Sequence, residues 1–161
     1  MTRRSLDPID RIILTELQAN GRITNVDLAE KAGITAPPCL RRVRALEAAG
    51  FIKGYHADLD ADSLGYGICV FALVRLRSQA EADLQAFEQH MSLLPEVREC
   101  HMLNGDIDFI LKIVAKDIHS FQKFLTTSIT PAPNVASVKT SLTIRTSKIV
   151  PGVPVPEVQK P

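Results

Sequence analysis

Through roughly the first fifty residues, apolar residues recur at every third or fourth position, the periodicity of helices with one buried face. Asp7 followed by Pro8 predicts the start of the first helix, because an acidic N-cap and a proline at the first helical position are typical of helix N-termini. Asn20-Gly21 predicts its end. The stripe that this helix would bury consists of Ile9, Ile12, Ile13 and Leu17.

Two further helices are predicted after this one, joined by a tight turn. Thr24 and Asp27 are close to a capping-box pattern at the start of the first, and Gly33 predicts its end. Thr35 is positioned to cap the next helix, which we expect over residues 35–49. Its buried face would consist of Cys39, Val43 and Leu46, with Leu40 at the margin. A capped helix, a glycine turn and a second amphipathic helix are the pattern of a helix-turn-helix.

The exposed side of the last of these helices is basic. Pro37 and Pro38 lie in its first turn, where a missing N–H group costs little. Arg41 and Arg44 project opposite the buried face, and Arg42 projects from its flank. This arrangement predicts contact with DNA, because arginine binds guanine or phosphate through paired hydrogen bonds. The alternative is that Arg42 or Arg44 forms a salt bridge with its own domain.

Residues 51–57 follow the last predicted helix and have the composition of a short extended segment. This segment would return toward the helices as the wing of a winged helix-turn-helix. Wings commonly touch the DNA backbone, and Lys53 is the candidate for that contact. The polar, turn-rich residues 58–65 are expected to be a linker.

The second half of the chain alternates predicted strands and helices. Strands are expected at 67–77, 97–103, 107–115 and 135–148, and helices at 80–94 and from a cap at Asp117 to a stop at Pro131. The order βαββαβ predicts a ferredoxin-like domain with one antiparallel sheet and both helices on one face. The fold class is therefore α+β, an N-terminal winged helix-turn-helix followed by a ferredoxin-like βαββαβ domain.

The first predicted strand of this domain is apolar at every position from Ile68 to Val74. A continuous apolar run indicates that both faces of the strand are covered. Two helices cover only one face, so a second copy related by a two-fold axis is the simplest cover for the other. A helix-turn-helix that reads two half-sites about 34 Å apart also requires two copies. We therefore expect a homodimer.

Composition and charge are those of an ordinary globular protein. The chain has 45% hydrophobic and 23% charged residues and a net charge of +1, so it is not a polycation. Residues 36–54 carry four basic residues against one acidic residue, so the positive charge is local. Three widely spaced cysteines argue against a disulfide framework. The sequence shows no apolar targeting core or membrane-spanning run, so we expect a cytoplasmic protein with no membrane partner.

Six segments carry a resemblance to a known family. They are LDPIDRIIL at 6–14, NGRITNVDLA at 20–29, RRVRALE at 41–47, GFIKGY at 50–55, ECH at 99–101 and GDIDF at 105–109. These segments resemble the Lrp/AsnC family (leucine-responsive regulatory protein / asparagine regulator) of prokaryotic transcription factors, over roughly residues 6–150. The resemblance implies a winged helix-turn-helix followed by an effector-binding domain that responds to amino acids.

The resemblance also implies an assembly and a site. Dimers would associate into tetramers, octamers or larger forms, with an octamer favoured here, and the effector would lie between dimers. The implied effector-binding residues are Gly105, Asp106 and Asp108 in a turn, with Ser128, Thr140 and Ser141 facing it. The family often has a hydroxyl residue where this chain has Pro37, so one polar DNA contact would be lost or replaced by an apolar one.

The candidate effector turn has a simpler interpretation. Asp106 and Asp108 could bind the ammonium group of an amino acid, but Asn-Gly-Asp is also ordinary hairpin chemistry, and Asp108 could point inward. No nucleophile, base and orienting group occur together, so we expect no catalytic residues and no enzyme. His56, His90, His101 and His119 are scattered, so we expect no metal. No cofactor is expected beyond an amino-acid effector.

The expected organisation is a DNA-binding domain at 1–57, a linker at 58–65, an effector-binding and oligomerisation domain at 66–150 and a disordered tail at 151–161. The expected DNA-binding residues are Thr35, Pro37, Pro38, Arg41, Arg42, Arg44 and Lys53, with Thr35 acting mainly as a helix cap. The predicted function is a sequence-specific transcriptional regulator of double-stranded DNA that responds to an amino acid. The alternatives are an architectural, chromatin-like DNA-binding protein without an effector, and a small-molecule-binding module or enzyme.

Overall fold

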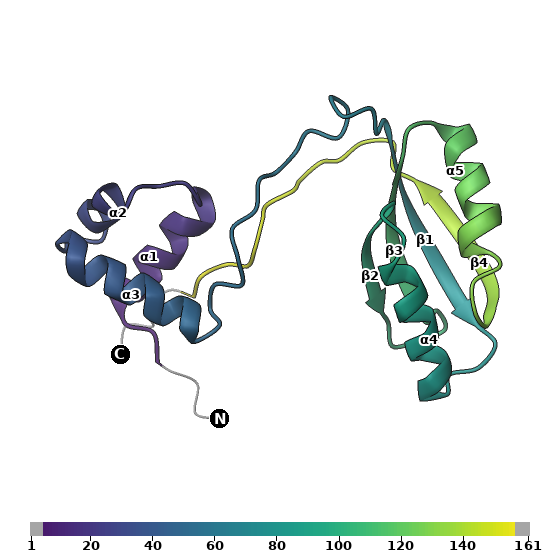
Figure 1. The fold of residues 1–161 in the computed structure, drawn as a ribbon, viewed down its shortest axis with the longest axis horizontal. Coiled ribbons are helices and arrows are strands. Elements are labelled where there is room, and N and C mark those ends of the chain that lie inside the picture. Colours follow the sequence, from purple (N-terminus) through teal and green to yellow (C-terminus); the bar gives the residue numbers. More distant parts are fainter. Residues whose placement is uncertain (1–4, 157–161) are drawn as a thin grey trace. The chain divides into compact units, whose positions relative to one another are not determined.

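The computed structural model describes residues 5–156 and divides the chain into two compact units. The first contains residues up to Asp58 together with residues from Lys148 onward, and the second comprises Leu59–Ser147. Figure 1 shows the helical first unit and the second unit, in which helices accompany a sheet. Within the described residues, no helix has both the length and the apolar character needed to cross a bilayer.

The first unit is built from α1 (Pro8–Ala19), α2 (Asn25–Lys31) and α3 (Ala36–Ala48), as predicted. The first helix starts at its predicted cap, where the Asp7 carboxylate accepts a 2.8 Å hydrogen bond from the backbone N–H of Asp10. The apolar stripes of the helices meet in one small core. Its fully buried members are Ile13, Leu28, Ala29, Ala32, Cys39 and Leu46.

A tight turn at Gly33 joins α2 to α3. Gly33 has a φ of +67°, a conformation that glycine adopts without the steric penalty of a side chain. The N–H of Gly33 donates to the carbonyl of Glu30, and the N–H of Ile34 donates to the carbonyl of Ala29, both at 3.0 Å. This pair of bonds is a Schellman motif. The turn therefore fixes the direction in which α3 leaves α2.

Thr24 caps α2, but in a different way from the predicted capping box. Its hydroxyl oxygen accepts from the backbone N–H of Asp27 at 3.2 Å and donates to the Asp27 carboxylate at 2.7 Å. A capping box uses Glu or Gln at the third helical position to reach the N–H of the cap residue. The aspartate side chain is one methylene shorter, and it binds the Thr24 hydroxyl instead.

The expected wing does not form a strand. Residues 52–60 have no helix or strand in the structure. The Tyr55 hydroxyl joins this segment to α3 by donating a 3.0 Å hydrogen bond to the Glu47 carboxylate. Burial and then this hydrogen bond raise the pKa of Tyr55 to about 12, so the hydroxyl remains a donor at neutral pH.

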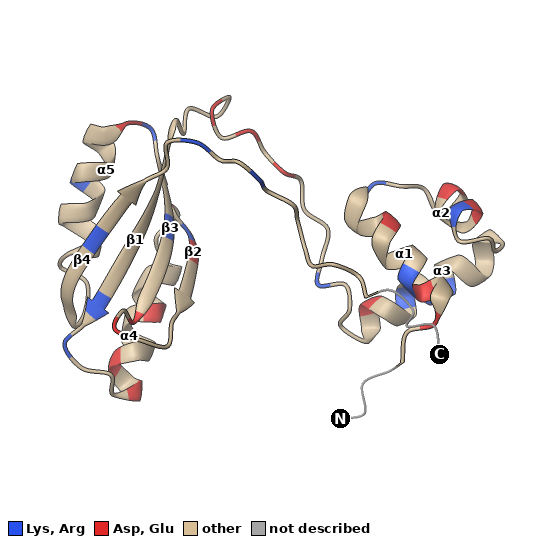
Figure 2. Cartoon of the chain, turned by 180° about the vertical axis from the view of Figure 1, so that it is seen from behind, with Lys and Arg blue, Asp and Glu red and all other residues tan. Residues whose placement is uncertain are grey.

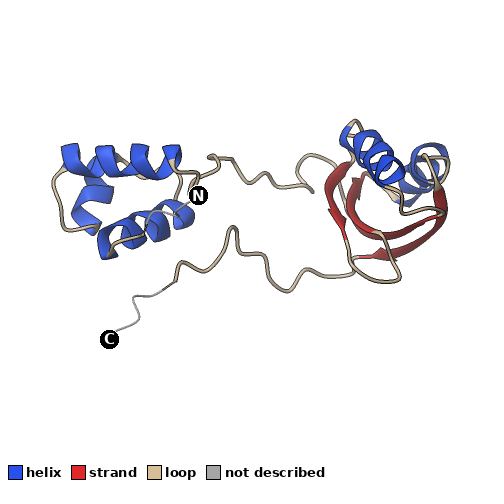
Figure 3. Cartoon of the chain, turned by 90° about the horizontal axis from the view of Figure 1, so that it is seen from below, coloured by secondary structure: helices blue, strands red, loops and turns tan. Residues whose placement is uncertain are grey.

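The second unit has the predicted βαββαβ order. Its elements are β1 (Ile68–Leu76), α4 (Glu81–Ser92), β2 (Val97–Met102), β3 (Phe109–Ala115), α5 (Ile118–Phe124), a π-helical turn η1 (Leu125–Ile129) and β4 (Val135–Leu142). The strands are ordered β2-β3-β1-β4, and every neighbouring pair is antiparallel. Figure 3 shows the helices of this unit on one face of the sheet. This is the ferredoxin-like arrangement.

Within one chain, β1 is covered on one face only. Val70, Ala72 and Val74 are buried beneath the helices, at 0–1% exposure. Phe71 is 37% exposed on the opposite face, and Leu73 beside it is half-buried. The apolar run in the sequence therefore corresponds to one buried face and one open apolar face.

The last strand is shorter than predicted, because β4 ends at Leu142 instead of Lys148. Leu142 pairs with Val70, and the N–H of Thr143 donates to the carbonyl of Cys69 at 2.9 Å. Only Ile68 of β1 lies before Cys69. Residues after Thr143 therefore have no further part of β1 to pair with.

The segment after β4 also differs from the expected disordered tail. Residues from Lys148 onward belong to the first unit. The Gln18 side chain on α1 donates to the carbonyl of Val153 at 2.9 Å and accepts from its N–H at 3.3 Å, and the Arg11 guanidinium donates to the carbonyl of Pro156. Backbone groups of Val153 and Pro156 therefore have partners on α1. Residues 157–161 of the predicted tail lie outside the described residues.

Candidate DNA-binding surface and effector turn

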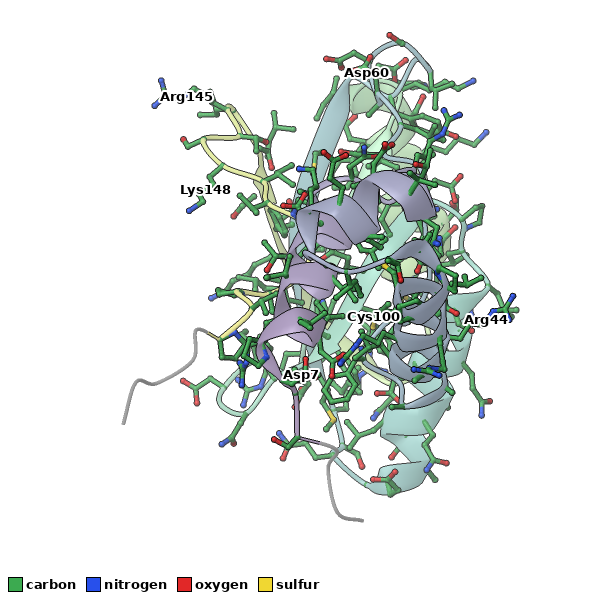
Figure 4. All side chains as sticks on the ribbon, turned by 90° about the vertical axis from the view of Figure 1, so that its left-hand side faces the viewer. Asp7, Arg44, Asp60, Cys100, Arg145 and Lys148 are labelled. Atoms are coloured by element: carbon green, nitrogen blue, oxygen red, sulfur yellow. The ribbon has the colours of Figure 1, made fainter. Side chains whose placement is uncertain are left out.

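The exposed face of α3 combines apolar and basic side chains. Pro37, Leu40, Arg41 and Arg44 are spaced by three, four and seven residues from the first, which places them on one side of the helix. Cys39 and Leu46 occupy the opposite, buried side. Arg41 and Arg44 are exposed, and neither has an ion-pair partner within the described part of the chain. Figure 4 shows Arg44 extending away from α3. Both guanidinium groups are available to an external anion.

Arg42 forms a salt bridge with its own domain, which is the alternative interpretation that the sequence left open. Its guanidinium Nη1 lies 2.6 Å from the Asp7 carboxylate and 2.8 Å from the Asp10 carboxylate. The Asp10 side chain is only 2% exposed. Figure 2 shows acidic and basic positions together where α1 approaches α3. Arg42 therefore ties α3 to α1 and neutralises a buried charge.

The charges of this cluster stabilise one another. The hydrogen bond from the Asp10 N–H, followed by that from Arg42, lowers the pKa of the Asp7 carboxyl. The hydrogen bonds to Asp7 and then Asp10 raise the pKa of Arg42. The sequence near Arg42 gives no signal for this contact, because Asp7 and Asp10 are 35 and 32 residues away along the chain.

Thr35 occupies the N-cap position of α3, but its side chain makes no capping hydrogen bond. A cap side chain normally accepts from the N–H of the second or third helical residue. In α3 these residues are Pro37 and Pro38, which have no N–H. Thr35 therefore stands at the predicted cap position, but its exposed hydroxyl makes no capping bond and remains available.

Lys53 is also exposed and has no ion-pair partner among the described residues. It lies on the strandless segment that follows α3. Because Arg42 is paired with Asp7 and Asp10, the basic side chains of the first unit that remain available to DNA include Arg41, Arg44 and Lys53. All three follow the start of α3, as the helix-turn-helix pattern predicts for a DNA-binding surface.

The predicted effector turn connects β2 to β3. Its Gly105 has a φ of +145°, and Asp106 beside it is exposed. The turn is closed by a 2.8 Å hydrogen bond from the N–H of Leu103 to the carbonyl of Asp108. Asp106 therefore presents its carboxylate to solvent from a fixed turn.

Asp108 faces the interior and is 5% exposed. Its two carboxylate oxygens accept 2.7 Å hydrogen bonds, one from the backbone N–H of Leu76 and one from the side-chain amide of Gln79. Its own N–H donates to the carbonyl of Val74 at 3.0 Å. These contacts join the turn to the end of β1, which matches the alternative interpretation that Asp108 points inward. Gln79 is the partner that sequence reasoning missed.

The other predicted effector residues are not gathered around this turn within one chain. Thr140 pairs with Ala72 and Ser141 with Phe71, so these neighbours on β4 face opposite sides of the sheet. Ser128 lies in η1, where its carbonyl is 3.1 Å from the His90 imidazole. None of the described hydrogen bonds joins any of them to Asp106.

The described residues contain no group of three or more His, Cys, Asp or Glu side chains that could hold a metal ion.

Comparison with known protein families assigns both units. Residues 69–153 match the Lrp/AsnC ligand-binding domain, and residues 6–53 match a winged helix-turn-helix DNA-binding domain. The leucine-responsive regulatory protein of Rhizobium meliloti is 51% identical over 92% of this chain and 95% of its own length. The Bkd operon transcriptional regulator of Pseudomonas aeruginosa is 40% identical over 87% of this chain and 92% of its own length.

Solved structures lead to the same conclusion. A transcriptional regulator of Neisseria meningitidis in complex with L-Met has a TM-score of 0.89 and 33% identity, covering 93% of this chain and 97% of that one. AsnC of Escherichia coli has a TM-score of 0.83 and 25% identity, and the match covers 91% of this chain and 97% of that one. The chain therefore belongs to the Lrp/AsnC family of transcriptional regulators, which combine a DNA-binding helix-turn-helix with a ligand-binding domain and are not enzymes.

Proposed function

We propose that this regulator binds duplex DNA through the exposed face of α3 and changes its DNA affinity when an amino acid binds the second unit. The observation that carries the proposal is a pair of exposed arginines, Arg41 and Arg44, on the helix after the tight turn, neither of which has an ion-pair partner among residues 5–156. Lys53 would add a backbone contact, and Thr35 would offer a hydroxyl. Because the partner is chromosomal DNA, the proposed place of action is the cytoplasm.

We propose an amino acid as the effector because similar proteins are named for leucine or were solved with L-Met. In this chain Asp106 would bind the ammonium group, and backbone N–H groups near Gly105 would bind the carboxylate. Asp108 would hold the turn in place. Ser128, Thr140 and Ser141 would contribute only from neighbouring copies, so the site would form between dimers. Binding there would then change the stability of the assembly and, by linkage, its DNA affinity.

Comparing Asp106→Ala with Asp108→Ala tests this assignment. The intact chain is used to select DNA from a random pool, and the affinity for that DNA is measured by fluorescence anisotropy with each of the twenty amino acids. We expect at least one amino acid to shift the wild-type affinity by about fivefold or more, the lower end of allosteric coupling. Asp106→Ala should keep DNA affinity and lose this shift. Asp108→Ala should instead lower the unfolding free energy by about 2 kcal/mol, because buried N–H donors lose their acceptor.

The assignment fails if Asp106→Ala responds to the amino acid as the wild type does, or if it loses DNA binding altogether. If no amino acid shifts the wild-type affinity, the architectural DNA-binding alternative is favoured instead.

We also propose that a second copy covers the open face of the sheet. This face carries the apolar side chains Phe71, Leu73 and Ile110, and next to Phe71 the Lys112 ammonium on β3 lies 2.9 Å from the Glu99 carboxylate on the edge strand β2. The hydrogen bond from Lys112, and next that from His101, lowers the pKa of Glu99, so this carboxylate stays ionised at neutral pH. Exposed apolar side chains combined with a few polar groups are typical of a subunit interface. Such dimers would associate further into even-numbered assemblies, with an octamer favoured.

Phe71→Asp should therefore weaken dimerisation by roughly 100-fold, the effect of a central interface residue, while the chain stays folded. Sedimentation of dilute protein measures the change, and circular dichroism checks the fold. Ile118→Asp is a matched control, because Ile118 is 52% exposed on α5, away from the open face. Equal dissociation of both variants, or an unchanged dimer in Phe71→Asp, would contradict the proposed interface.

A further inference from the structure

The first turn of α3 presents an unusual surface for a helix that is proposed to enter a DNA groove. Pro37 is exposed, and Leu40 is 39% exposed. Both are apolar, yet they lie on the side of the helix opposite its buried stripe. The two residues are three positions apart, so they adjoin on the helix surface. Arg41 and Arg44 continue the same face. An exposed apolar patch is thus followed directly by two exposed cations.

The polar groups that a helix N-terminus normally offers are reduced here. The first four N–H groups of a helix have no partner inside the helix, and they commonly bind phosphate. In α3 two of these four positions are Pro37 and Pro38, which lack the group. The leading end of this helix is therefore poor in hydrogen-bond donors and rich in carbon.

Only one group on the base edges of the major groove matches such a surface. Every base pair presents hydrogen-bonding atoms there, but thymine alone presents a methyl group, on its C5 atom. Recognition helices contact base edges with their N-terminal residues. The rise from Pro37 to Arg44 is about 10 Å, which corresponds to about three base-pair steps. The apolar patch and the arginines would therefore face adjacent base pairs.

We infer that Pro37 and Leu40 are specificity-determining residues that read thymine methyl groups, next to guanines or phosphates bound by Arg41 and Arg44. This inference depends on the proposed entry of α3 into the major groove and goes beyond it by naming the chemical group that is read. It also explains how the chain can lack a hydroxyl at position 37: contact with carbon replaces a hydrogen bond.

Replacing thymine by deoxyuridine tests the inference, because it removes the methyl group and leaves the base-pairing atoms unchanged. The intact chain selects DNA from a random pool, and each thymine of the selected site is then replaced in turn. At one or two positions in each half-site the wild-type affinity should fall about fourfold, the effect expected for one buried methylene-sized group. In Pro37→Ser and Leu40→Gln the same replacements should change affinity by less than about 1.5-fold, since the carbon surface is gone.

Val26→Gln is the matched control, because it removes an apolar side chain that is 67% exposed on α2 and leaves Pro37 and Leu40 in place; it should keep the fourfold sensitivity. Thermal melting checks that each variant is folded, and Leu40→Gln provides the test if Pro37→Ser does not fold. The inference is overturned if deoxyuridine has no effect at any position, or if both variants remain as sensitive as the wild type. Failure of the wild type to bind any pool DNA would overturn the proposed function as well, and it is distinguished by the absence of a selected site.

Discussion

Replacing Arg41 and Arg44 together with alanine is expected to weaken binding to the selected DNA by roughly 100-fold or more at about 100 mM salt, because each bidentate arginine contributes about 1–3 kcal/mol. The variant should remain folded. Both side chains are exposed and have no ion-pair partner among the described residues, so their loss should change the unfolding free energy by less than about 0.5 kcal/mol. Fluorescence anisotropy and urea unfolding measure the two quantities on the same preparation.

The salt dependence of the same titration separates the roles of the two arginines. Each phosphate contact that is lost should reduce the slope of log affinity against log salt by about 0.9, whereas a lost base contact should leave the slope unchanged. A variant with Arg98 and Lys123 both changed to alanine removes the same charge from exposed positions of the second unit. If this control binds DNA as weakly as the Arg41 and Arg44 variant, a general effect of charge explains the lost affinity, and the proposed contacts do not.

Arg42→Ala should lower the stability of the protein and leave DNA affinity nearly unchanged, the opposite of the variant that lacks Arg41 and Arg44. We expect it to lower the unfolding free energy of the first unit by about 3 kcal/mol, because it removes the cation that faces a buried charge. The buried charge is that of Asp10, whose side chain is 2% exposed and lies 2.8 Å from the Arg42 guanidinium. Urea unfolding followed by circular dichroism measures the loss. Arg41→Ala, one residue away and without an ion pair among the described residues, is the control.

The contribution of Asp7 to this cluster should depend on pH. Its pKa is lowered in the folded chain, so its stabilising effect is complete above its ordinary pKa and is lost as the pH falls through the lower folded value. The gap in stability between the wild type and Arg42→Ala should therefore narrow in strong acid. An Arg42→Ala protein as stable as the wild type at neutral pH would contradict the role of the ion-pair cluster.

The sequence alone indicated the helices, the strands and their order, because these depend on local signals. Periodicity placed α1 and α3, and Gly33 marked the turn between α2 and α3. Helix ends were predicted within a residue or two wherever a cap or a glycine was present. The last strand was predicted too long, because its length depends on where β1 begins and not on its own residues.

The site was harder to predict, because the role of a side chain depends on distant partners. Nothing near Arg42 in the sequence shows that Asp7 and Asp10 will lie beside it, and nothing near Asp108 indicates its bond to Gln79. The case of Thr35 is different, because the two prolines that follow it already excluded the usual capping bond.

The most direct test of the central claim compares DNA binding by three single variants of α3, namely Arg41→Ala, Arg42→Ala and Arg44→Ala. Anisotropy is measured in conditions where circular dichroism shows each one folded, and affinities are corrected for the active fraction. The claim predicts that Arg41→Ala and Arg44→Ala each weaken binding by about tenfold or more, whereas folded Arg42→Ala binds nearly as the wild type does. The reverse result, with DNA affinity lost only in folded Arg42→Ala, would contradict it.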